Sequence, residues 1–302
     1  MNKKLFLCIK IAISLLLIYF VFTKVDISEV LASWSNFSLG AIVTVLILHF
    51  SALLINTIKW KLFLPEQTFR RLFQFTFIDV FYGMALPGQV SGEVAKAYRL
   101  GKRTGDMRKV AVSVWMDKLT GIIGLVFLVL IGFIFSTRSF PAYFYIITAV
   151  LFIGGVLSIY VFNFSLLSTF LEKYLSWKLI GTILSSIKDF KKDHRVIFSN
   201  IILGALYQAL SIMITMVFAH ELGIEISIID WFWIFGLISI IQFIPISIAG
   251  LGVREASFVG ILSLFLIPTG AAVTLSLSIF GIQLIFAIAG FLFESHYNLS
   301  HR

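Results

Sequence analysis

The sequence predicts an all-α integral membrane protein with about six full transmembrane helices and two broken, re-entrant helical hairpins. Three observations lead to this fold class: an apolar composition, a series of long apolar runs, and basic residues that gather in some loops and avoid others. Hydrophobic residues make up 59% of the 302 residues, charged residues only 13%, and the mean hydropathy is +1.01. A chain this apolar cannot cover a soluble body with polar surface, and its single cysteine, Cys8, excludes an internal disulfide framework.

Six apolar runs are expected to cross the bilayer completely, because the hydrocarbon core is about 30 Å thick and takes ~20 apolar residues in a helix. These spans are expected at about 5–23, 38–58, 110–135, 141–162, 197–219 and 270–293. The first is predicted to be a retained span and not a signal peptide. Lys10 interrupts it, and no cleavage site with small residues precedes Val25.

Three further apolar runs, 72–87, 231–249 and 254–267, are expected to enter and leave the membrane on one side. The segments 59–71 and 92–109 flank the first of them and are both basic, so the positive-inside rule places both in the cytoplasm. The first broken element is therefore predicted at about 72–100, opening from the cytoplasm. A second, at about 231–267, is predicted to open from the outside.

The charges of the loops predict the orientation of the chain. Lys59 and Lys96 are counted among the basic residues of the cytoplasmic loops, whereas the loop 220–230 is purely acidic and is expected outside. Both termini are then cytoplasmic, and residues 1–302 form a single polytopic domain in the cytoplasmic membrane.

The cytoplasmic segment at about 163–196 carries apolar residues at helical spacing with lysines among them. This pattern is typical of helices that lie on a leaflet with anionic head groups. A solvated connector with no lipid contact is an equally good interpretation.

The two broken elements share a sequence signature, Pro-x₄-Gly followed by glutamate. The first reads Leu86-Pro87-Gly88-Gln89-Val90-Ser91-Gly92-Glu93, and the second reads Ile244-Pro245-Ile246-Ser247-Ile248-Ala249-Gly250-Leu251-Gly252-Val253-Arg254-Glu255. Proline and glycine break a helix, and broken helices at matching positions of two oppositely oriented halves indicate a transporter's substrate site. The alternative is that Pro87, Ser91, Pro245 and Gly250 only shape helices for packing.

Charged residues within or beside apolar runs are the candidate site, because an ionisable group at the bilayer centre costs ~2.5–3.5 kcal/mol on insertion scales. They are Asp79, Glu93, Asp117, Lys118, Arg254 and Glu255. Arg254 is expected to hold a phosphate with two parallel hydrogen bonds, and Lys118 to add a point charge. Glu93, Asp117 and Glu255 are expected to orient the head group, aided by backbone N–H groups of the half-helices that start after Gly92 and Gly252. The alternative is that these charges only neutralise partners within the bundle.

Other chemistry finds little support in the sequence. His49 is interpreted as a satisfied contact between helices and not as a ligand. The spacing of histidine, cysteine and carboxylate residues predicts no metal site, and no nucleotide motif predicts a cofactor or a nucleic-acid partner.

At these residues the sequence resembles the transmembrane region of lysylphosphatidylglycerol synthases, a flippase-like domain. The resemblance covers nearly the whole chain and rests on Leu86-Pro87 with Gly92-Glu93 and Arg99, on Asp117-Lys118-Leu119, and on Ile244-Pro245 with Gly250-Leu251-Gly252-Val253-Arg254-Glu255. It implies movement of aminoacylated phosphatidylglycerol between leaflets. The soluble domain that transfers the aminoacyl group in full-length relatives has no counterpart in these residues, so lysyl transfer is not expected.

The middle motif departs from the family pattern. Relatives usually carry Glu-Arg where this chain has Asp117-Lys118, which keeps the charge signs but loses the planar fork of arginine. The head group is therefore left open among an anionic phospholipid, an aminoacyl-lipid and a polyprenyl-linked lipid.

The leading hypothesis is a lipid flippase or transporter that holds an anionic head group between the two broken elements. A second hypothesis is a lipid-modifying enzyme with Asp79 or Glu93 as general base. A third is an accessory subunit that docks a membrane-associated transferase through 163–196, and a homo-oligomer is compatible with all three.

Overall fold

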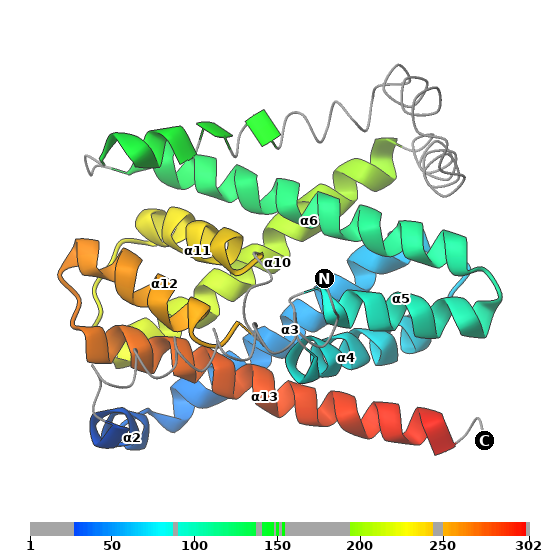
Figure 1. Cartoon of the computed structure of the whole chain (residues 1–302), viewed down its shortest axis with the longest axis horizontal. Coiled ribbons are helices and arrows are strands. Elements are labelled where there is room, and N and C mark those ends of the chain that lie inside the picture. The colour runs from blue at the N-terminus through cyan, green and yellow to red at the C-terminus, as the bar shows by residue number, and fades with distance from the viewer. Residues whose placement is uncertain are drawn as a thin grey trace, which may run out of the picture.

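The computed structural model describes residues 27–86, 90–136, 141–147, 149–150, 153–154, 194–243 and 250–299 (Figure 1). Every regular element within these residues is helical. The elements are α2 (Ile27–Ser35), α3 (Leu39–Phe63), α4 (Phe69–Ala85), α5 (Ser91–Thr104), α6 (Met107–Phe135), α10 (His194–Glu221), α11 (Ile228–Phe243), α12 (Val253–Leu262), the 3₁₀-helix η1 (Ser263–Phe265) and α13 (Thr269–Leu299).

Four of the described helices, α3, α6, α10 and α13, are long and apolar enough to cross a membrane. The protein is therefore a multi-pass membrane protein, and four of the six predicted spans are confirmed. The predicted span 5–23 lies outside the described residues, and 141–162 is described only in part.

The long helices begin where the sequence supplies a cap. Ser38 precedes α3, and its hydroxyl accepts a hydrogen bond from the backbone N–H of Ala41 at 3.1 Å. Asp106 precedes α6 and accepts from the N–H of Lys109 at 3.0 Å. Both caps satisfy backbone donors that have no partner in the first turn. The helices then carry apolar residues on every side, as expected where one face meets lipid and the other meets protein.

Close backbone contacts hold the long helices together. Helix α10 packs against α3 and α6, and α11 packs against α6. A Cβ atom added to Gly124 of α6 would lie 2.6 Å from the backbone nitrogen of Ala205, and one added to Gly132 would lie 2.8 Å from that of Trp233. Small residues at such contacts allow helix backbones to approach closely in a membrane protein. Helix α6 thus packs against α3, α5, α10 and α11.

Two pairs of shorter helices pack at opposite ends of the bundle (Figure 1). Helices α4 and α5 lie beside the beginning of α6, where Gly101 meets Met107. Helices α11 and α12 lie toward its other end, where Gly132 meets Trp233. The inner ends of the pairs point toward the middle of the molecule.

Some sequence predictions fall on residues that the structure does not describe. Pro87, Gly88 and Pro245, which belong to the predicted helix breaks, are among them. So are residues 163–193 of the predicted interfacial segment.

The contact at Gly124 generates a stability prediction. Substitution Gly124→Ala places a methyl group against a backbone atom of α10, so we expect it to lower the free energy of unfolding by about 1–3 kcal/mol. The control Gly281→Ala adds the same methyl in α13, where nothing lies within 4 Å, and is expected to leave stability unchanged or raise it by about 0.5–1 kcal/mol. Apparent melting temperatures of the two variants in detergent compare them directly. Equal melting would contradict the close α6–α10 contact.

Candidate functional site

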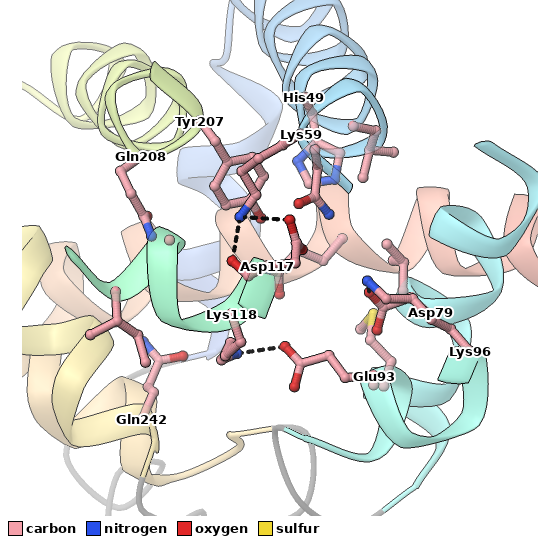
Figure 2. Close-up of a pocket in the computed structure, with 18 of the residues that line it drawn as sticks. His49, Lys59, Asp79, Glu93, Lys96, Asp117, Lys118, Tyr207, Gln208 and Gln242 are labelled. Carbon is pink, nitrogen blue, oxygen red and sulfur yellow. Dashed lines mark hydrogen bonds and ion pairs between the residues drawn. The ribbon is translucent and has the colours of Figure 1, made fainter. Parts of the chain in front are cut away.

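A cavity of about 270 Å³ lies inside the bundle, and residues of α3, α4, α5, α6, α10, α11, α12 and α13 line it (Figure 2). Five of the six predicted charged residues face it: Asp79, Glu93, Asp117, Lys118 and Arg254. The sixth, Glu255, does not line the cavity. The structure thus brings together charges that lie up to 175 positions apart in the sequence, from Asp79 to Arg254.

A deeply buried ion pair at the cavity joins α3 to α6. The ammonium of Lys59 lies 3.2 Å from the Asp117 carboxylate and donates to the backbone oxygen of Asp117 at 2.8 Å (Figure 2). Asn200 of α10 fixes this point of α3, because its amide donates to the backbone oxygen of Lys59 at 2.6 Å and its oxygen accepts from Thr120 at 2.6 Å. Lys59 is only 4% exposed. Its predicted position in a cytoplasmic loop is therefore wrong.

A second pair joins α4 to α5. The Lys96 ammonium lies 3.0 Å from the Asp79 carboxylate and 4.7 Å from the ring centre of Trp60, and Lys96 is 2% exposed. The close approach of the two helices requires Gly92, where a Cβ atom would overlap the backbone oxygen of Asp79. Lys96, predicted as a loop charge, is therefore another cation of the cavity.

The first turn of α5 contributes two predicted residues. Ser91 donates its hydroxyl to the backbone oxygen of Tyr82 at 3.0 Å, which fastens the start of α5 to α4. Glu93 accepts from the ammonium of Lys118 of α6 at 2.6 Å (Figure 2). A carboxylate in the first turn of a helix is also favoured by the helix dipole. The Lys118–Glu93 pair therefore bridges α5 and α6 across the cavity.

The fourth pair lies at the start of α12. The guanidinium of Arg254 donates to the Glu255 carboxylate at 2.9 Å and to the Ser276 hydroxyl at 3.0 Å. Glu255 also accepts the backbone N–H of Gly252 at 2.6 Å. Gly250 and Gly252 have φ values of 75° and 82°, a backbone conformation that favours glycine. Glu255 thus holds the guanidinium of Arg254 by an ion pair. Of the two residues, Arg254 lines the cavity and Glu255 does not.

A further cluster, outside the cavity lining, holds α13 to the α4–α5 pair. Arg99 donates to the carboxylate of Glu294 and to the hydroxyl of Tyr82, and Tyr82 donates to Glu294 at 2.9 Å. Arg99 thus links α5 to α4 and α13.

Uncharged polar side chains also line the cavity, beside several apolar residues and glycines, and sequence reasoning missed most of them. They are Asn56, Tyr207, Gln208, Gln242 and Gln283, together with His49. The interpretation of His49 as a satisfied contact is not supported: its ring lies 4.4 Å from that of Phe286, and its Nε2 has no hydrogen-bond partner among the described residues. The sequence feature that could have identified the amide residues is the presence of asparagine and glutamine side chains within apolar runs.

The lining offers hydrogen-bond donors, hydrogen-bond acceptors and charges of both signs between the long helices. Within the described ranges, no group of three histidine, cysteine or carboxylate residues is placed to hold a metal ion. The arrangement is suited to binding a polar group by charge and hydrogen bonds.

Comparison with known proteins identifies a matching family. The sequence model of the family described as lysylphosphatidylglycerol synthase TM region matches residues 7–290. A search of curated proteins gives no match.

The Lys59–Asp117 pair generates a prediction about stability. Either Lys59→Met or Asp117→Asn leaves one buried charge without its partner, so each is expected to cost about 3–5 kcal/mol of unfolding free energy. The double variant removes both charges and is expected to cost clearly less than the sum of the two. Lys109→Met is the control, because Lys109 and Glu66 form an exposed pair for which a cost below about 1 kcal/mol is expected. Denaturation of the purified protein in detergent measures all four, and additive costs of the two single variants would disprove the pairing.

Proposed function

The chain belongs to the lysylphosphatidylglycerol synthase TM-region family and crosses the membrane several times, and we propose that it moves a lipid between leaflets. The polar head group would occupy the central cavity while the acyl chains stay in the bilayer.

One observation carries this proposal: a cavity rich in charged and amide groups lies between helices that are otherwise apolar (Figure 2). Polar groups inside a membrane protein are expensive to bury and usually face a water-filled path or a substrate. A cavity of about 270 Å³ is too small for a whole phospholipid and large enough for a compact head group. This size fits a protein that takes the head group from the bilayer and leaves the tails behind.

The topology that we propose follows from the two helix pairs. The α4–α5 pair enters from the cytoplasm and the α11–α12 pair from the outside, as the two halves of an inverted repeat, within six full spans. The basic residues Lys102, Arg103 and Lys109 near the α5–α6 connection, against Glu225 near the start of α11, support this orientation. In transporters of inverted-repeat design, the substrate site lies where such broken helices meet.

Arg254 and Lys118 are proposed to offset the phosphate charge, with Glu93 and Asp117 orienting the rest of the head group. The first backbone N–H groups of α5 and α12 would add donors to the same anion. Glu255 is proposed to hold Arg254 in place.

The alternative of a lipid-modifying enzyme is less well supported. A general base must be able to accept a proton from its substrate. Both candidate bases, Asp79 and Glu93, are engaged by lysine ammonium groups, at 3.0 Å and 2.6 Å. We therefore propose transport.

Blocking the cavity tests the function without changing any charge. Gly83 lines the cavity, and a Cβ atom there meets nothing within 4 Å, so Gly83→Phe is expected to fill the cavity and leave the fold intact. In liposomes with fluorescently labelled phospholipid, wild type is expected to speed exchange between leaflets, and Gly83→Phe to return it to near the protein-free rate. Gly281→Phe is the matched control, since Gly281 is equally unobstructed and lies outside the lining. Full activity of Gly83→Phe would remove the cavity from the path.

Cysteine labelling tests the topology, and replacing Cys8 by serine gives a background without reactive thiols. With an impermeant maleimide, Lys102→Cys and Leu266→Cys are expected to react from opposite sides of the membrane. Val90→Cys, at the inner end of the α4–α5 pair, is expected not to react from the Leu266 side. Its labelling from that side would mean that α4 crosses the membrane completely.

A further inference from the structure

The charged side chains around the cavity balance one another. Within the described part of the chain, four cations and four carboxylates form four pairs there: Lys59–Asp117, Lys96–Asp79, Lys118–Glu93 and Arg254–Glu255. The cavity's remaining polar lining is largely carboxamide and adds no charge. The segments 87–89 and 244–249 contain no charged residue in the sequence. Counted over the residues that the structure describes, the lining and its ion-pair partners therefore carry no net charge.

The four pairs differ in how far a ligand can reach them. The side chains of Lys118 and Glu93 are 32% and 17% exposed, whereas Lys59 with Asp117 and Arg254 with Glu255 are at most 7% exposed. In the Lys96–Asp79 pair only the carboxylate has comparable exposure, at 18%. The Lys118–Glu93 pair is thus the one whose two members can both turn to a bound head group.

A site without net charge is expected to prefer a head group without net charge. A head group with a single negative charge that takes Lys118 would leave Glu93 unpaired in a region of low dielectric, and an uncompensated buried charge is strongly unfavourable. A head group that carries both a phosphate and an ammonium lets each member of the pair exchange its partner. No charge is then left alone, and both new contacts are charge-assisted hydrogen bonds.

We infer that the preferred substrate has a compact zwitterionic head group, with one phosphate and one primary ammonium, whose phosphate binds Lys118 and whose ammonium binds Glu93. This inference rests on the proposed function and narrows it, because the sequence leaves the head group open among an anionic phospholipid, an aminoacyl-lipid and a polyprenyl-linked lipid. The cavity volume of about 270 Å³ lies below the range of roughly 300–1,000 Å³ typical of drug-sized ligands, which also favours a small head group over a glycosylated one.

Lipid binding to the whole detergent-purified protein tests the inference directly. The probes are phosphatidylethanolamine, which is zwitterionic, and phosphatidylglycerol, which is net anionic, with identical acyl chains and native mass spectrometry as the readout. Wild type is expected to bind phosphatidylethanolamine about tenfold more tightly, an order of magnitude for one unpaired charge in a partly exposed site. Equal affinity, tighter binding of phosphatidylglycerol, or no binding of either lipid overturns the inference.

Two variants change the net charge of the site and so test whether that charge sets the preference between the two lipids. Glu93→Gln leaves the site with an excess positive charge and is expected to shift the preference toward phosphatidylglycerol. Lys118→Gln leaves an excess negative charge and is expected to weaken phosphatidylglycerol binding further. Glu66→Gln and Lys109→Gln make the same charge changes in an exposed pair away from the cavity and are expected to leave the preference unchanged. If they shift it equally, the effect is one of overall charge, and the inference fails.

Leaflet exchange of the same two lipids separates the inference from the proposed function. A phosphatidylethanolamine preference in both binding and exchange supports both. The same preference in binding without any exchange supports the head-group assignment and overturns transport. Exchange of both lipids at equal rates, with equal binding, supports transport and overturns the assignment.

Discussion

A charged group inside a membrane protein must find an opposite charge or water, because the surrounding hydrocarbon offers neither. The interior of this bundle meets that constraint with ion pairs, and most of them join different helices. Lys59 of α3 meets Asp117 of α6, Lys96 of α5 meets Asp79 of α4, and Lys118 of α6 meets Glu93 of α5. The pairing therefore links α3 to α6, α4 to α5 and α5 to α6 around the cavity.

The pairs also explain why the cavity stays polar between apolar helices. Two of the three lysines have a further buried contact: the amide of Asn200 donates to the backbone oxygen of Lys59, and Trp60 lies against the ammonium of Lys96. The close contact at Gly92 brings α4 and α5 near enough for the Lys96–Asp79 pair to form, and the contact at Gly124 brings α10 near α6, where Asn200 bonds Thr120 and Lys59. Packing and charge thus support one another, and the cavity is the space that the paired side chains leave open.

Much of the fold follows from the length of the apolar runs. Helices α3, α6, α10 and α13 coincide with four predicted spans, because only an α-helix of this length satisfies its backbone hydrogen bonds across a bilayer. Asp117 and Arg254 were identified as site residues because they interrupt apolar sequence.

The remaining site residues could not be predicted in this way. Lys59 stands at the end of an apolar run and Lys96 within the basic segment 92–109, where a helix with one buried face and a cytoplasmic loop have similar compositions. Only the packing of α3 on α6 and of α5 on α4 reveals that these lysines point inward. Carboxamides such as Gln208 and Gln283 cost less to bury than charges, so one of them in an apolar run gives little warning of a cavity.

The pairing of charges around the cavity determines how strongly the membrane potential acts on this part of the protein. The membrane potential does work on a moving charge, about 2.3 kcal/mol for each elementary charge carried across 100 mV. Groups that move as neutral pairs experience almost no net electrical force. A rearrangement in which the two members of a pair move together is therefore nearly independent of voltage, whereas one that separates them along the membrane normal is not.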